Sequence, residues 1–212
     1  MPDLNSLLPG VRYVVVGGTA TSLYMAPRTT KDVDVLVSAA DAAAVEDLLR
    51  KAGATLVGPL SIDNPLMIEG DTWRLPDGSD VDVLRSAQPW VEGALTQPNR
   101  DAAGSPVISL PYLVLMKLAS GRGVDMGDLS RMLGGADGDA LERVRHVVEM
   151  YLPDAVDDVD SLAEMGRWEL QPEPVNTQSP PQPSLASDSV IVHEHKRRGR
   201  MVREHTRRRP RR

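Results

Sequence analysis

The first hundred residues alternate short apolar runs with polar segments, and the lengths of these runs favour strands over helices. Val11 to Val16 is one such run and ends at a pair of glycines, and Val33 to Val37 is a second. Further short runs that predict strands lie at 55–57, 66–68 and 72–75. The last of them is expected to pair with residues 81–84 across a Pro-Asp-Gly-Ser turn, because such residues favour tight turns.

Helical spacing of apolar residues appears in a different set of segments. In residues 41–52, apolar side chains recur on one face, with Asp41 as a candidate N-cap and Gly53 directly after the end. A short helix is also expected at Thr19–Met25. Beyond a loop at 97–105, further helices are predicted at 110–120, 125–133, 139–151 and 154–168. Glycines mark the breaks between the first three of these four segments.

These elements together predict an α/β (α+β) fold in which flanking helices pack on a mixed sheet. The sheet core is expected over about residues 10–100 and a small helical part over about 107–151, both within one domain at 1–170. From residue 171 the chain is rich in Pro and Gln, which excludes a packed helix or strand there. Residues 171–212 are therefore predicted to be a Pro-rich linker and a disordered, arginine-rich tail.

Charge is distributed unevenly along the 212 residues. Residues 193–212 hold ten Lys or Arg against two Glu, a net charge of +8, so the overall −6 leaves −14 for residues 1–192. An acidic body disfavours contact with nucleic acid phosphates, whereas a basic tail favours it. The chain has no Cys, which excludes disulfides and thiolate metal sites and fits a reducing cytoplasm. No signal peptide or membrane-spanning apolar run is evident.

Candidate chemistry is concentrated at three points of the predicted sheet. Gly17, Gly18 and Thr19 follow the first strand, where backbone N–H groups at a helix start can hold a phosphate. Asp32 and Asp34 share one face of the second strand because side chains alternate along a strand. A third acidic strand carries Asp80 and Asp82, also on one face. Three carboxylates beside a glycine turn suit magnesium-dependent chemistry on a nucleotide.

The order of these motifs resembles the nucleotidyltransferase fold of polymerase beta type, and most closely its AbiEii-like abortive-infection toxin branch. The resemblance rests on Gly17-Gly18, on the run from Arg28 to Asp34 that contains Lys31 and Asp32, and on Asp82. It continues through Leu110–Ala119, where the branch carries a lysine, here Lys117. An arginine and two acids three residues apart follow it, here Arg122, Asp125 and Asp128. The resemblance covers about residues 10–135.

The resemblance implies an enzyme that moves a nucleoside monophosphate from an NTP to an acceptor by a two-metal mechanism with Mg²⁺. In that picture Asp32, Asp34 and Asp82 bind the metal ions, and Asp82 is preferred to Asp80 because apolar residues flank it. Nucleotide binding is implied for Gly17, Gly18, Thr19, Arg28 and Lys31, and the amine of Lys117 is expected to face the triphosphate. An ordinary lysine that extends its amine to solvent remains the alternative for Lys117.

The acceptor is left open by the sequence. In the AbiEii-like branch it can be tRNA, and the protein can be a growth-arresting toxin paired with an antitoxin protein. The basic tail is a candidate RNA contact. Two other functions fit the same residues: a non-catalytic protein that binds nucleic acid or a partner, and a small-molecule nucleotidyltransferase of the antibiotic-modifying type.

Overall fold

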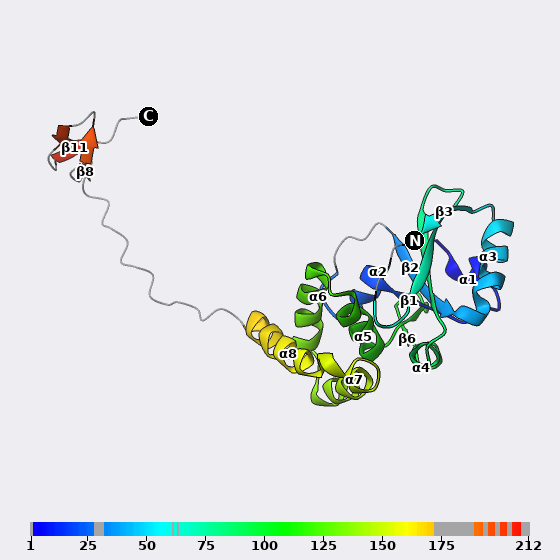
Figure 1. The fold of residues 1–212 in the computed structure, drawn as a ribbon. Helices are drawn as coiled ribbons and strands as arrows, with labels where there is room; N and C mark the ends of the chain where they lie inside the picture. The colour runs from blue at the N-terminus through cyan, green and yellow to red at the C-terminus, as the bar shows by residue number, and fades with distance from the viewer. Residues whose placement is uncertain are drawn as a thin grey trace. The chain divides into compact units, whose positions relative to one another are not determined.

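The structure is a computed structural model, and its chain divides into two compact units, Met1–Gln171 and Pro172–Arg212. In the first unit it describes residues 2–27, 32–60, 62 and 64–171. In the second it describes the backbone of four short strands. Figure 1 labels elements of both units.

The first unit is built on a mixed sheet of seven strands in the order β3-β4-β5-β2-β1-β7-β6. The strands are β1 (Tyr13–Val16), β2 (Val33–Ser38), β3 (Thr55–Pro59), β4 (Glu69–Arg74), β5 (Asp80–Ser86), β6 (Asn99–Arg100) and β7 (Pro106–Val107). Two neighbouring pairs, β2 with β5 and β1 with β7, are parallel, and the other pairs are antiparallel. The predicted α/β fold with a mixed sheet is therefore confirmed.

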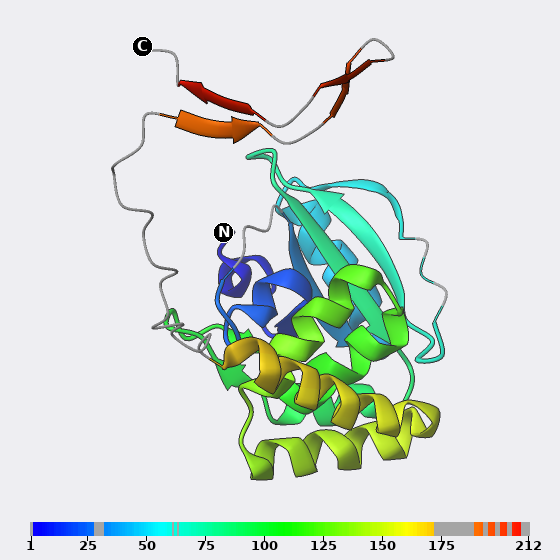
Figure 2. The ribbon, with the colours of Figure 1, turned by 90° about the vertical axis from the view of Figure 1, so that its left-hand side faces the viewer.

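Helices cover both faces of this sheet. Those of the first unit are α1 (Leu4–Leu7), α2 (Gly17–Thr21), α3 (Ala42–Lys51), α4 (Trp90–Thr96), α5 (Leu110–Ser120), α6 (Gly123–Gly134), α7 (Gly138–Tyr151) and α8 (Val156–Leu170), with 3₁₀ turns at Ala39–Asp41 and Pro153–Ala155. Figures 1 and 2 show α3 on one side of the sheet and the group α5 to α8 on the other. The helical part that follows the sheet is thus present as expected.

The core joins the sheet to these helices through small aliphatic side chains. Val14, Val16, Val35 and Leu36 are fully buried on the central strands, and the chain has no Phe to contribute. Strands that are buried on both faces have continuous apolar runs rather than alternating ones. This explains why β1 consists of four buried residues in a row.

Three local predictions need correction. The run at 66–68 is a turn and not a strand, because Asn64 Oδ1 accepts hydrogen bonds from Leu66 N and Ile68 N while Met67 has a φ of 51°. The stretch 97–105 is not wholly a loop, since it contains β6. The first helix after β1 begins at Gly17 and ends at Thr21 rather than spanning 19–25.

Two glycines allow α6 and α8 to pack in backbone contact. A Cβ atom placed on Gly166 would lie 1.8 Å from the Ser130 carbonyl oxygen, and one on Gly134 would lie 2.3 Å from the Gly166 carbonyl carbon. Real Cβ atoms do not approach backbone atoms so closely. The helical part therefore depends on glycine at this crossing.

Gly166→Ala is expected to lower the free energy of unfolding by about 1–3 kcal/mol, because the two helices must separate to admit a methyl group. The matched control is Gly127→Ala on α6, where a Cβ meets nothing within 4 Å. That change should be neutral or stabilising by up to about 1 kcal/mol, because Ala is the better helix former. Urea unfolding of both variants measures the difference, and equal stability would show that the crossing is not tight.

The four strands of the second unit form two antiparallel pairs, β9 with β10 and β8 with β11. They are β8 (Ser189–Val192), β9 (His195–Arg197), β10 (Arg200–Val202) and β11 (His205–Arg208). Arg197 pairs with Arg200 and Val192 pairs with His205, which keeps the same offset in both strand pairs. The predicted disorder of residues 171–212 stays a prediction.

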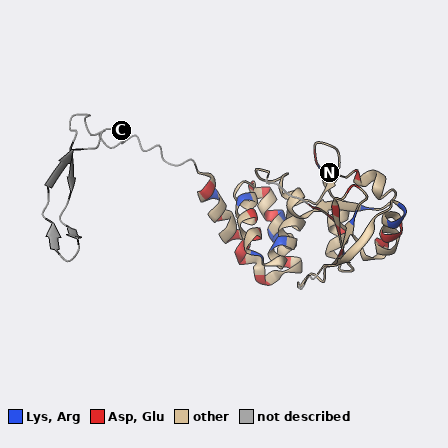
Figure 3. Cartoon of the chain, turned by 90° about the horizontal axis from the view of Figure 1, so that it is seen from above, with Lys and Arg blue, Asp and Glu red and all other residues tan. Residues whose placement is uncertain are grey.

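Among the described residues, none of the helices has the length and apolar character needed to cross a membrane. Acidic residues mark the helices of the first unit at many positions (Figure 3).

Candidate active site at the acidic edge of the sheet

Three adjacent strands bring the acidic and glycine motifs together. In the pairing of β1 with β2, Val16 lies opposite Asp34, so that Gly17 begins beside this carboxylate. In the parallel pairing of β2 with β5, Asp34 lies opposite Asp82. Residues directly opposite in a sheet point to the same face. The sheet therefore places the Asp34 and Asp82 side chains next to each other, at the residue where β1 ends.

The Asp34 carboxylate leaves no room for a side chain at position 17. The φ of Gly17 is +63°, which favours glycine, and a Cβ at this position would lie 2.0 Å from Asp34 Oδ2. The carboxylate thus fills the space in which any other residue would place its side chain. The first glycine of the turn is required twice over, once by its backbone conformation and once by the neighbouring acid.

The Asp34 carboxylate is held in an environment unfavourable to its charge. Burial, followed by the charges of Asp82 and Asp32, raises its pKa from 3.8 to about 6, and the positive charges of Arg122 and Lys117 only partly oppose this. A half-buried acid among other acids is costly unless a cation binds there. Strongly shifted carboxyl groups of this kind are concentrated at functional sites.

Asp82 and Asp80 lie two residues apart on β5 but have different partners. Asp82 Oδ1 accepts a 2.6 Å hydrogen bond from the hydroxyl of Thr72, which stands opposite it on β4. Burial raises the pKa of Asp82 against the effect of this bond, and the charges of Asp32 and Asp80 raise it further. Asp80 instead forms a bidentate ion pair with Arg74, whose Nε and Nη2 donate to Asp80 Oδ1 and Oδ2 at 2.5 and 2.9 Å. The geometry thus favours Asp82 as the acid beside Asp34.

Thr72 is a site residue that the sequence motifs do not include, although the sequence carries a signal for it. Leu75 N donates to the Ser79 carbonyl across the Pro-Asp-Gly-Ser turn. Counting back along both strands from that pair places Thr72 opposite Asp82. The register of a tight hairpin is therefore enough to identify the hydroxyl that contacts the third carboxylate.

Asp82→Asn is expected to lower activity by at least about 100-fold, because the amide cannot act as an anionic ligand or proton acceptor. Asp80→Asn should stay within about threefold of wild type, because Asp80 lies opposite Arg74 and pairs with it rather than with the acids of the site. Steady-state rates of nucleotide transfer by the two variants test this ranking. The reverse ranking would shift the assignment by two residues along β5.

The remaining glycine-turn residues lie at the same edge of the sheet. Asp32 is exposed just before β2, and its carbonyl accepts a 3.5 Å hydrogen bond from the Thr19 hydroxyl. The Gly18 carbonyl accepts a hydrogen bond from Thr21 Oγ1 at 2.6 Å. Arg28 and Lys31, for which the family resemblance implies nucleotide binding, lie outside the described residues.

Lys117 is not extended toward solvent but enclosed between two acids. Its side chain is 5% exposed, and Nζ donates to Asp125 Oδ1 at 2.6 Å and to Asp128 Oδ2 at 2.8 Å. Burial alone would raise the pKa of Asp125, but hydrogen bonds from Lys117, Ser120 and Arg122 bring it below its ordinary value. The alternative of a solvent-directed lysine is therefore wrong, while a contact between Lys117 and the triphosphate stays a prediction.

We call the end of strands β1, β2 and β5 that carries Gly17, Asp32, Asp34 and Asp82 the acidic edge. Its donor chemistry fits a divalent cation. Asp34, Asp82 and Asp32 supply the hard oxygen atoms that Mg²⁺ prefers, and burial, with the charges of Asp82 and Asp32, raises the pKa of Asp34. Within the described residues, however, no three His, Cys, Asp or Glu side chains are close enough together to enclose one ion. Asp34 and Asp82 would provide the first ligands, and the expected pair of Mg²⁺ ions stays a prediction.

Comparison with known proteins yields structures alone. No family model and no curated protein matches the chain. The solution structure of the antibiotic-resistance factor ANT(2″)-Ia aligns at 14% identity over 78% of this chain and 90% of that one, with a TM-score of 0.41. A crystal structure of ANT(2″)-Ia with adenylyl-2″-tobramycin covers 78% and 95% with the same identity and TM-score. A candidate nucleotidyltransferase from Thermotoga maritima aligns at 18% identity over 60% and 84%, with a TM-score of 0.38. At such low similarity, function must be argued from the geometry of the acidic edge.

Proposed function

We propose that the first unit is a metal-dependent nucleotidyltransferase that moves a nucleoside monophosphate from an NTP to an acceptor hydroxyl. The observation that carries the proposal is the contact between Gly17 and the Asp34 carboxylate, with Asp82 next to Asp34 on the neighbouring strand. A glycine turn that can receive phosphates and a carboxylate pair that attracts cations thus share one edge of the sheet. This is the arrangement that a nucleoside triphosphate with its metal ions requires.

Each group at the acidic edge has a role in the proposed reaction. The acceptor oxygen forms a bond to the α-phosphorus while the bond to the leaving oxygen breaks and pyrophosphate departs. The hydroxyl proton passes to Asp82, whose raised pKa suits a proton acceptor. The N–H groups after Gly17 orient the triphosphate, and Lys117 and Arg122 contribute positive charge. Bound Mg²⁺, held by Asp32, Asp34 and Asp82, would neutralise the phosphate charges.

A direct test is to incubate the protein with each α-labelled NTP and Mg²⁺. Three acceptors are offered in separate reactions: total RNA, purified tRNA and an aminoglycoside. Metal-dependent transfer of label to any of them supports the enzyme, and the favoured acceptor separates a tRNA-modifying toxin from an antibiotic-modifying enzyme. If no NTP labels any acceptor, the proposal fails and the non-catalytic binding protein becomes the better interpretation. An antitoxin partner is tested separately, by asking whether expression arrests growth and which neighbouring gene relieves the arrest.

For an RNA acceptor, the basic tail is proposed to supply affinity that the acidic body lacks. Truncation after Leu170 removes the segment of +8 charge and leaves a body of −12, with 14 basic and 26 acidic residues. RNA affinity at low salt is expected to fall about tenfold or more, and the loss should shrink as salt rises because phosphate contacts are salt-dependent. Titration of labelled RNA at several salt concentrations measures this effect. Equal affinity of both proteins at low salt would exclude the tail as an RNA contact.

A further inference from the structure

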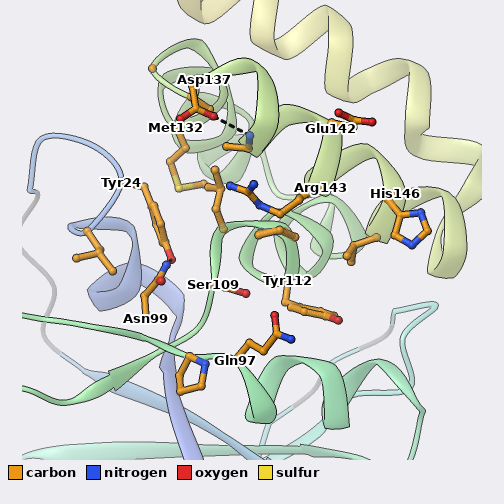
Figure 4. A pocket seen from close by; sticks show the side chains of 18 residues that line it. Tyr24, Gln97, Asn99, Ser109, Tyr112, Met132, Asp137, Glu142, Arg143 and His146 are labelled. Atoms are coloured by element: carbon orange, nitrogen blue, oxygen red, sulfur yellow. Dashed lines mark hydrogen bonds between the residues drawn. The ribbon is translucent and has the colours of Figure 1, made fainter.

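A cavity lies away from the acidic edge. Its volume is about 970 Å³, and its walls come from the turn after α2, residues 97–99, the first turn of α5, the end of α6 and one face of α7. Figure 4 shows these elements meeting around an open space. It is not lined by any of the residues assigned to the metal ions or the triphosphate. The volume suits a ligand of nucleotide size, since small-molecule sites occupy about 300–1,000 Å³.

One wall of the cavity is a fixed aromatic surface. Tyr24 donates a 2.7 Å hydrogen bond to the Ile108 carbonyl, and its oxygen accepts a 2.6 Å bond from Asn99 Nδ2. These two bonds hold the ring in place although it follows a short helix. The apolar side chains of Met132 and Leu110 lie nearby in the lining. A rigid aromatic ring with apolar neighbours is suited to stacking a planar base.

A cation reaches into the same space from α7. In Figure 4 the guanidinium of Arg143 extends over the cavity toward Tyr24. Within the part of the chain that the structure describes, Arg143 forms no ion pair or hydrogen bond. Arginine is the side chain best adapted to a phosphate, through its planar set of donors. His146, three residues later on α7, lines the cavity on the same side.

The acids of the lining do not neutralise Arg143. Asp137 is the N-cap of α7, and its Oδ1 accepts a 2.7 Å hydrogen bond from Ala140 N, drawn as a dashed line in Figure 4. Glu142 precedes Arg143 on α7, and its carboxylate points away from the guanidinium in the same view. Among the described residues neither acid pairs with Arg143, so its guanidinium remains available to an anionic group of a ligand.

The helix α5 connects this cavity to the acidic edge. Its first turn, including Tyr112, lines the cavity, whereas Lys117, proposed to contribute positive charge at the acidic edge, lies in its last turn. From Ser109 to Lys117 the helix rises by about 12 Å. A single nucleotide does not occupy both places, but a polymer can have one unit in the cavity and its reacting hydroxyl at the acidic edge.

We propose that this cavity is an acceptor subsite that holds one nucleotide unit of an RNA, with its base against Tyr24 and its phosphate at Arg143. The inference rests on the proposed function, which it deepens by naming the acceptor class and where it binds. Free nucleotides share this chemistry, so the experiment includes AMP beside RNA. The amide oxygen of Asn99 would accept a hydrogen bond from an exocyclic amine of the base.

The decisive experiment compares Arg143→Gln with Arg145→Gln. Arg145 lies on the same helix but pairs with Asp160, at 2.5–2.7 Å, and does not line the cavity. Arg143→Gln should raise KM for the RNA acceptor about tenfold, the loss of one charge-assisted contact, with KM for the NTP and kcat nearly unchanged. Arg145→Gln should leave all three values near wild type. Equal acceptor KM in the two variants would overturn the subsite.

A second measurement does not depend on catalysis. In the full-length protein without metal or NTP, a short RNA oligonucleotide should perturb the NMR signals of Tyr24 and Asn99, and Ala140→Phe, which fills the cavity, should abolish the perturbation. AMP producing the same shifts at equal affinity would reassign the cavity to free nucleotides and overturn the acceptor subsite. If RNA binds there but no transfer is detected, the proposed function fails while the binding site stands. If transfer occurs without any shift at Tyr24, the proposed function stands and the acceptor subsite is overturned.

Discussion

Asp34→Asn is expected to lower nucleotide transfer by at least about 1,000-fold while the protein remains folded. The amide keeps the shape of the side chain beside Gly17, but it removes the charge that the proposed site uses to hold cations. Loss of such a ligand should cost about 4 kcal/mol of transition-state stabilisation. Single-turnover rates at saturating NTP and Mg²⁺ measure the change. Activity within about tenfold of wild type would exclude the metal assignment.

The same variant should be more stable than wild type when metal is removed by a chelator. Because the pKa of Asp34 is raised to about 6 in the folded state, ionisation costs the fold as pH rises from about 4 through 6. The rise in pKa from 3.8 to about 6 corresponds to about 3 kcal/mol. Wild type and variant should therefore be equally stable near pH 3 and diverge up to about pH 7. Urea unfolding across this range provides the check.

A matched control separates charge at the site from charge in general. Asp80→Asn also removes one carboxylate from the same part of the sheet, but from a residue paired with Arg74. It should lose little activity and gain no stability above pH 6. If both variants behave alike, the effect of Asp34 reflects the overall negative charge of the acidic edge rather than a specific site.

The parts of the fold that the sequence predicts well are those whose boundaries have a local cause. The helix predicted at 110–120 has the observed bounds of α5, because Pro111 stands in its first turn and Gly121, with a φ of 62°, ends it. The strand β2 is predicted almost to the residue, since acids precede a buried Val and Leu run. Local side-chain chemistry is sufficient in both places.

The parts that sequence alone does not predict depend on distant contacts. The strand β7 has two residues and exists because Val107 pairs with Val15 in β1, more than ninety residues earlier in the chain. The helix α4 is not predicted, although Trp90, Val91 and Leu95 are buried in it. Neither element has a periodic pattern long enough to be recognised from sequence. The cavity beside Tyr24 depends on the same distant pairings and is hidden from sequence for that reason.

The position of the acidic site along the strands is easier to predict from sequence than the contacts that its residues make with the helices. Alternation along a strand predicts that Asp32 shares a face with Asp34, whereas the structure begins β2 at Val33, directly after Asp32. It brings Asp34 beside Asp82 on the neighbouring strand. The enclosure of Lys117 by Asp125 and Asp128 does not follow from the sequence, because it depends on how α5 and α6 pack together. This enclosure leaves two roles for the lysine, one in catalysis and one in the fold, which substitution can separate.

Lys117→Met is expected to lower the free energy of unfolding by about 3–5 kcal/mol, because it breaks a buried ion network by removing one partner. Methionine fills the space of the lysine stem but leaves Asp125 and Asp128, each under 4% exposed, without their shared cation. Loss of the shared cation is costly for two buried carboxylates, even though Asp125 keeps its contacts with Ser120 and Arg122. Urea unfolding at neutral pH measures the loss.

The triple variant Lys117→Met, Asp125→Leu, Asp128→Leu tests whether the loss comes from buried negative charge that Lys117 no longer balances. Removing all three charges together should restore most of the stability, because apolar replacements of a buried ion network are often neutral. The stable triple variant then allows transfer to be measured without a folding defect. If it transfers nucleotide at nearly the wild-type rate, Lys117 acts in the fold. If it is inactive although folded, and Lys117→Met alone is as stable as wild type, the lysine acts on the triphosphate, as the sequence resemblance to the nucleotidyltransferases implies.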